Sequence, residues 1–84
     1  MKKRTADAIY LDILMALEAG PVVPTRLARI VNVPYDRMVD YTSFLEGRGL
    51  LRKEVVDGQN VFRLLPDGYV LCQDWRKVQM KLRL

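Results

Sequence analysis

The fold of this chain is decided by residues 32–58, which read NVPYDRMVDYTSFLEGRGLLRKEVVDG. In the first half of this stretch, apolar and small side chains recur every three or four residues, as is typical of a helix with one buried face. The pattern predicts a helix from Pro34 to Gly47 or Arg48, because proline is accepted at a helix start and Gly49 favours a stop. Its inner face is expected to consist of Met38, Tyr41, Thr42 and Leu45.

The second half of the stretch changes its pattern. Residues 50–56 and 59–65 are strand-like runs separated by Asp57-Gly58. An Asp-Gly pair between two such runs is a strong hairpin signal, because both residues tolerate the positive φ angles of a two-residue turn. The sequence therefore predicts a β-hairpin directly after the helix.

Two further helices precede this stretch. Apolar residues at helical spacing predict a first helix over residues 5–19, which Gly20-Pro21 ends. Val22 and Val23 then suit a short edge strand. A second helix over residues 25–31 is expected to bury Leu27, Ile30 and Val31. Asn32 tolerates the left-handed conformation and so predicts a tight turn into the next helix.

A last helix is predicted to begin at Pro66, and Gly68 is expected to weaken its first turn. Its apolar stripe, at spacings of four, three and four, consists of Leu71, Trp75, Val78 and Leu82. The stripe either packs on the first helix of the same chain or forms the seam of a two-chain coiled coil. We favour the seam, and therefore divide the chain into a winged helix-turn-helix body, residues 1–65, and an expected dimerisation helix, residues 66–84.

The order helix, helix, helix, hairpin, helix is that of an α+β winged helix-turn-helix with an added C-terminal helix. The runs VPYDRMVDY at residues 33–41 and FLEGRGLL at residues 44–51 resemble the short archaeal winged helix-turn-helix regulators. So does IYLDIL at residues 9–14, followed by its Gly-Pro. The resemblance implies a transcription regulator that binds duplex DNA and dimerises through its C-terminal helix, commonly as an antiparallel coiled coil.

Composition excludes several other classes of protein. The 84 residues suffice for one domain. A single cysteine and no histidine argue against structural zinc, disulfides and acid–base catalysis. No apolar run is long enough for a membrane span or signal peptide. We expect a cytoplasmic protein that is not an enzyme, with no cofactor, metal, membrane or evident small-molecule ligand.

The net charge of +4 is concentrated at the two ends of the chain. Between Thr5 and Trp75 there are seven Lys and Arg against ten Asp and Glu. Terminal basic residues suit contacts with phosphates, whereas the acidic body weakens the case for a uniformly basic DNA-binding face.

The exposed start of the third helix supplies the candidate base-reading residues. Arg37 is the foremost candidate, because a guanidinium can grip guanine O6 and N7 together, although it can instead pair with a neighbouring acid. Asp40 is expected to orient Arg37, and Asp36 to stabilise the helix start. Tyr35 either contacts a phosphate or packs against the preceding turn, with burial favoured.

The remaining DNA contacts are expected from the flanks. Arg26, at the start of the second helix, suits the DNA backbone, as do Lys53 and Arg63 on the hairpin and Lys3 and Arg4 on an N-terminal arm. The alternative function, from another class, is a docking module for a protein partner without intrinsic DNA binding. The acidic residues on the third helix favour that alternative.

Overall fold

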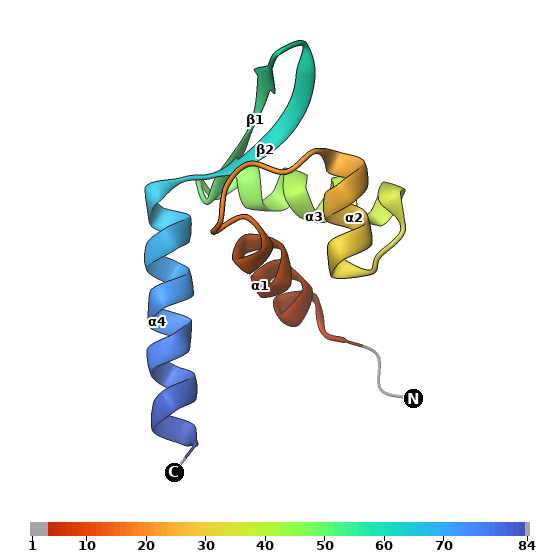
Figure 1. The fold of residues 1–84 in the computed structure, drawn as a ribbon. Coiled ribbons are helices and arrows are strands. Elements are labelled where there is room, and N and C mark those ends of the chain that lie inside the picture. The colour runs from red at the N-terminus through yellow and green to blue at the C-terminus, as the bar shows by residue number, and fades with distance from the viewer. Residues whose placement is uncertain (1–3, 84) are drawn as a thin grey trace.

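The computed structural model describes residues 4–83, which form four helices and one hairpin (Figure 1). The order is α1 (Ala6–Ala16), α2 (Pro24–Val31), α3 (Tyr35–Gly47), β1 (Leu51–Val56), β2 (Gln59–Leu64) and α4 (Pro66–Leu82). The first three helices pack together, the hairpin projects from them as a wing, and α4 extends away from the body. The α+β architecture predicted from the sequence is confirmed.

Helix α1 supplies the centre of the core. Its first turn is capped by Thr5, whose hydroxyl accepts a hydrogen bond of 3.2 Å from the amide of Ala8. The helix ends at Ala16, three residues earlier than predicted, and the chain continues as turns to Gly20. Two of its residues, Ile13 and Leu14, are fully buried, as is Leu17 just beyond the helix. All three pack against apolar side chains from the other elements.

The tight turn between α2 and α3 forms at Asn32, as predicted. This residue caps α2 with left-handed backbone angles, φ 59° and ψ 52°. The prediction for Ile30 was wrong, because its side chain is 51% exposed. The buried residues of α2 are Leu27, Ala28 and Val31. Around the helix axis, Ile30 lies on the other side of Leu27 from Ala28 and Val31, and so points away from the core.

The hairpin turns at Asp57 and Gly58, both with positive φ, as the Asp-Gly signal predicted. Its antiparallel register pairs Leu51 with Leu64 at the base. Val22 adds one residue of pairing at the outer edge, exchanging two backbone hydrogen bonds with Phe62. The predicted edge strand is therefore reduced to a single bridge.

Helix α4 meets the body only through its first turns. Gly68 is buried there, and a Cβ on this residue would overlap the carbonyl oxygen of Leu50 and the side chain of Leu64. The predicted role of Gly68 was incomplete, since its missing side chain is what permits this close approach. Cys72, one turn later, is completely buried, and burial raises the pKa of its thiol. No helix among residues 4–83 has the length and apolar character to cross a lipid bilayer.

Candidate nucleic-acid interface

Two stripes of side chains flank the buried face of α3. One consists of Tyr35, Val39, Ser43 and Glu46, and faces the wing. The other has the same helical spacing, faces α1 and the groove beside α4, and consists of Arg37, Tyr41, Phe44 and Arg48. Three residues of the predicted inner face, Met38, Thr42 and Leu45, lie between the stripes and are buried, whereas the fourth, Tyr41, is only partly buried. Buried Thr42 is satisfied within the helix by donating to the carbonyls of Met38 and Val39.

The wing-side stripe borders a small groove of 80 Å³ between α3, the wing and the start of α2. Lys53 and Asn60 of the wing and Pro24 of α2 complete its walls. The carboxylate of Glu46 accepts a hydrogen bond of 3.1 Å from the backbone amide of Lys53, which fixes the end of α3 against β1. Helix, wing and helix start therefore form one continuous surface.

The α1-side stripe of α3 is aromatic. The ring of Tyr10 on α1 stacks on Phe44 at 4.7 Å between centroids and meets Tyr41 edge-on at 5.5 Å. The guanidinium of Arg48 lies 5.6 Å from the centre of the Phe44 ring. Helical spacing places Arg37 at the outer end of this stripe, away from the groove beside the wing.

Arg37, Asp40 and Tyr35 are all exposed on α3. Among residues 4–83, no ion pair forms between Arg37 and Asp36 or Asp40, so the pairing considered for Arg37 is not observed. The predicted burial of Tyr35 was wrong. Its ring lies on the rim of the groove, because the turn at Asn32 leaves it beyond the packed part of α2.

The two basic residues predicted on the wing lie on opposite faces of the hairpin. Lys53 is paired across the strands with Phe62 and shares the face that meets α3. Arg63 is paired with Arg52 on the other face, and both guanidiniums bind the carboxylate of Glu54. Hydrogen bonds from Arg63 and then Arg52 lower the pKa of Glu54.

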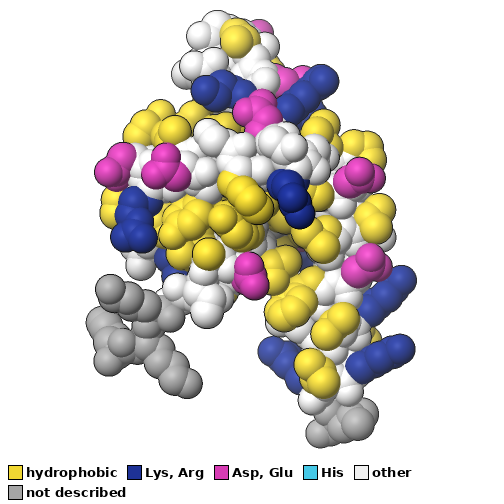
Figure 2. Space-filling model, turned by 180° about the vertical axis from the view of Figure 1, so that it is seen from behind, with side chains coloured by type: hydrophobic (Ala, Val, Ile, Leu, Met, Phe, Trp, Pro, Cys, Tyr) yellow, Lys and Arg dark blue, Asp and Glu magenta, His cyan; other side chains and the backbone are white. Residues whose placement is uncertain are grey.

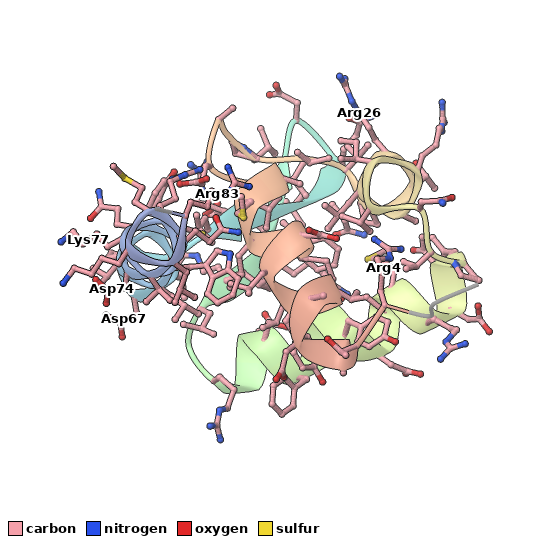
Figure 3. All side chains as sticks on the ribbon, turned by 90° about the horizontal axis from the view of Figure 1, so that it is seen from below. Arg4, Arg26, Asp67, Asp74, Lys77 and Arg83 are labelled. Atoms are coloured by element: carbon pink, nitrogen blue, oxygen red, sulfur yellow. The ribbon has the colours of Figure 1, made fainter. Side chains whose placement is uncertain are left out.

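The other predicted phosphate contacts are also spread out. Arg26 projects from the side of α2 that faces away from α3 (Figure 3). Arg4 lies between α1 and the α2–α3 turn, where its guanidinium binds Asp12 at 3.0 Å and the carbonyl of Asn32 at 3.0 Å. Arg4 is therefore anchored to the body, which corrects its description as part of a flexible arm. Lys3 lies outside the described residues.

Figure 2, which shows the molecule from behind, displays the charge on this side. Acidic and uncharged side chains gather over α3, while the lysines and arginines lie mainly on the wing and the lower half of α4. A hollow lined by hydrophobic side chains separates α4 from the body. Arg37 is the one basic residue of α3, so most of the basic side chains lie beside that helix.

The hollow is a groove of 680 Å³ between α1, the end of α3 and α4. Three members of the predicted α4 stripe line it, namely Leu71, Trp75 and Val78. Leu71 and Val78 are exposed and Trp75 is half-buried, while the buried residues of α4 are Gly68 and Cys72. Just past the middle of α4, Arg76 binds Glu18 in an ion pair that includes a 2.7 Å hydrogen bond and lowers the pKa of Glu18. The stripe remains available to another surface.

The family model described as winged helix-turn-helix matches residues 3–83 of this sequence. The chain belongs to the winged helix-turn-helix family. In its terms, α2 and α3 form the helix-turn-helix and β1–β2 form the wing. No curated protein sequence matches the chain significantly.

Solved winged-helix structures share its fold at low sequence identity. The transcriptional regulator BldR from Sulfolobus solfataricus is 21% identical with a TM-score of 0.80, over 88% of this chain and 55% of BldR. A MarR family regulator from Silicibacter pomeroyi is 21% identical with a TM-score of 0.74, over 86% of this chain and 51% of its own. Sso10a-2, a DNA-binding protein from Sulfolobus solfataricus, is 19% identical with a TM-score of 0.72, over 95% and 85%. The chain spans about half the length of the first two.

Sequence reasoning overlooked part of the groove beside the wing. Val39, Ser43 and Asn60 were not singled out as contacts, although Val39 and Ser43 follow Tyr35 at intervals of four residues. That spacing was the available signal. The prediction of contacts rested on charged side chains, and the exposed wing-side stripe of this winged helix contains only one, Glu46.

Proposed function

We propose that this winged helix-turn-helix protein binds double-stranded DNA as a homodimer and regulates transcription. In this proposal α3 enters the major groove and the wing contacts the flanking backbone. The observation that carries the proposal is the open surface formed by the wing-side stripe of α3, Lys53 and Asn60, which no other described element of the chain covers. The printed descriptions of BldR and Sso10a-2 support the same function.

The contacts are assigned by position. Tyr35 and Lys53 share the surface at the groove beside the wing, so we assign them the central contacts. Arg37 and Asp40, exposed on α3, are assigned to the edge of the bound site, and Arg26 to a flanking phosphate. Arg63 and Arg4 would reach phosphates by exchanging their present carboxylate partners, Glu54 and Asp12. Lys3 is assigned a phosphate on sequence grounds.

We assign residues 66–84, which contain α4, as the dimerisation element. Its stripe faces solvent across the groove, and Val78 is 46% exposed. The first half of α4 carries Asp67 and Asp74, whereas Lys77 and Lys81 lie in its second half. An antiparallel pairing of two copies of α4 places the acidic half of each against the basic half of the other, and buries both stripes.

The DNA assignment is tested by fluorescence anisotropy with a duplex long enough for two half-sites about 34 Å apart. We expect binding that weakens steeply between about 50 and 200 mM salt, with a log–log slope of about −0.9 per phosphate contacted. Lys53→Ala should make the slope shallower by about one per subunit. Lys77→Ala removes the same charge from the side of α4 that faces away from α1, and at protein concentrations that keep the dimer assembled it should leave the slope unchanged.

The dimer is tested by sedimentation of two matched variants. Val78→Asp places a charge in the proposed seam and should weaken self-association by about tenfold or more, since burying an unpaired carboxylate costs at least 1.4 kcal/mol. Val70→Asp is the control, because Val70 is 53% exposed and lies outside the groove lining. Equal effects of the two variants would contradict the assignment.

One observation favours a different function. Asp36, Asp40 and Glu46 place three acidic groups on the exposed side of α3, which repels phosphates and suits a basic protein partner. In that case α3 docks a protein, and duplex binding is absent or insensitive to salt. The same anisotropy titration separates the two functions.

A further inference from the structure

The wing-side stripe of α3 differs from the base-reading surface predicted from the sequence. Its four members are Tyr35, Val39, Ser43 and Glu46. None has the guanidinium or amide group that grips guanine or adenine with two hydrogen bonds. Arg37, the predicted guanine reader, belongs to the stripe on the α1 side. The chemistry of this stripe therefore depends on its uncharged side chains.

Val39 occupies the middle of the stripe. It lies one turn from Tyr35 and one turn from Ser43, and it is 39% exposed on the wall of the groove beside the wing. Glu46, at the far end, is held by the backbone amide of Lys53. An apolar, β-branched side chain with few rotamers is thus presented at the centre of the surface assigned to DNA.

The major-groove edge of a base pair offers an apolar group only at the 5-methyl of thymine. Every other group there is a hydrogen-bond donor or acceptor, and valine leaves it without a partner after water is expelled. A valine at the centre of a recognition surface therefore favours a thymine opposite it. Ser43 accepts either type of base and adds no opposing preference.

We infer that Val39 is a specificity-determining residue that selects DNA by contact with a thymine 5-methyl group. This inference rests on the proposed function, since it applies only if α3 enters a major groove. It predicts a preference carried by a single methyl group instead of by guanine contacts from Arg37. Val39 on α3 determines the preference for thymine. Lys53 on the wing raises the affinity for DNA of any sequence.

The test compares the binding of three alternating DNA polymers, two of which differ only in the 5-methyl group of the pyrimidine. Poly(dA-dT) carries the 5-methyl group, poly(dA-dU) lacks it, and poly(dG-dC) presents guanine. We expect the wild-type protein to bind poly(dA-dT) about fourfold more tightly than poly(dA-dU) for each recognition helix engaged, which corresponds to about 0.8 kcal/mol for one buried methyl. Poly(dG-dC) should bind no more tightly than poly(dA-dU).

Three variants make the readout specific. Val39→Ala should weaken binding to poly(dA-dT) and abolish the difference between the thymine and uracil polymers. Val70→Ala makes the same substitution on α4 and should keep that difference. Lys53→Ala should weaken binding to all three polymers by the same factor, because it removes a phosphate contact.

The outcomes separate the inference from the function beneath it. Salt-dependent binding of equal strength to the thymine and uracil polymers would overturn the role of Val39 while leaving DNA binding intact. A preference that survives Val39→Ala would also overturn it. Failure to bind any of the polymers at low salt would overturn the proposed function, and the inference with it.

Discussion

Helices α1 and α4 carry similar apolar spacing and have opposite surroundings. Leu14 of α1 and Leu17 in the turn after it are both 0% exposed. On α4 the corresponding stripe faces a groove, and Leu82 at its end is 80% exposed. The two helices also diverge along their length (Figure 1). An apolar stripe thus predicts a contact, while the rest of the fold decides whether the contact lies in the same chain.

The difference follows from the number of elements available. Three helices and the base of the hairpin enclose α1 on several sides. Helix α4 packs mainly on the end of α1 and the junction with β2, and beyond the Arg76–Glu18 ion pair its apolar stripe is exposed, with Val78 at 46% and Leu82 at 80%. A chain this small gains much by covering such a face with a second copy.

The largest expected effect is on the free energy of unfolding, when a leucine beside α1 and a leucine on α4 are each replaced by alanine. Leu17→Ala should lower the free energy of unfolding by about 2–5 kcal/mol, because it removes buried methyl groups and leaves a cavity. Leu82→Ala, at a protein concentration low enough to keep the chain monomeric, should change it by less than about 0.5 kcal/mol. Urea denaturation with both variants measures the contrast. Similar losses would show that α4 is packed within its own chain.

The next effect concerns the junction that joins α4 to the body. Gly68→Ala forces a methyl group against the Leu50 carbonyl and Leu64, and should cost about 1–3 kcal/mol through overpacking. Gly47→Ala is the matched control, because open space surrounds a Cβ there, and it should be neutral or stabilising by about 0.4–1 kcal/mol. Thermal unfolding of the two variants tests this. A stable Gly68→Ala protein would mean that α4 can shift away from β1 without cost.

The smallest effect is the pH dependence of the Glu18–Arg76 ion pair between the end of α1 and α4. The hydrogen bond from Arg76 lowers the pKa of Glu18 below its ordinary 4.5, so the pair stabilises the fold above that pH. This contribution is lost as the pH falls through the lowered pKa. The melting temperature of wild type should therefore exceed that of Glu18→Gln at neutral pH, and the gap should close in acid.

Arg76→Ala provides the control for this gap. Without the guanidinium, the main cause of the lowered pKa of Glu18 is removed. In this background the effect of Glu18→Gln on the melting temperature should not depend on pH. A gap that persists in the Arg76→Ala background would place the origin of the pH dependence elsewhere in the chain.

The sequence predicted the elements of the body well, because their signals are local. The turn at Asn32, the Asp57-Gly58 hairpin and the inner face of α3 each follow from residues within one or two turns of each other. Gly68 was misjudged because its role depends on the approach of Leu50, eighteen positions earlier, which no local pattern reveals.

The candidate site was less predictable. Helical periodicity places Arg37 and Tyr35 on different stripes although only one residue separates them, and the contacts of Tyr10 with Tyr41 and Phe44 decide which stripe faces α1. Strand alternation likewise separates Lys53 from Arg63 across the hairpin, once the register is known. The anchor of Arg4 on Asp12 and Asn32 depends on the packing of α1 beside the turn. The charges in the sequence identified the basic residues but did not indicate which of them lie together in the fold.

The most direct test of the account is a map of backbone amide chemical shifts as duplex DNA is added. The account predicts that the largest changes fall on the wing-side stripe of α3 and on the facing part of the wing, at Tyr35, Val39, Ser43, Lys53 and Asn60. The amides of the lower half of α4 should move little. Changes confined to the aromatic side of α3 or to α4, with Val39 and Lys53 unmoved, would contradict it.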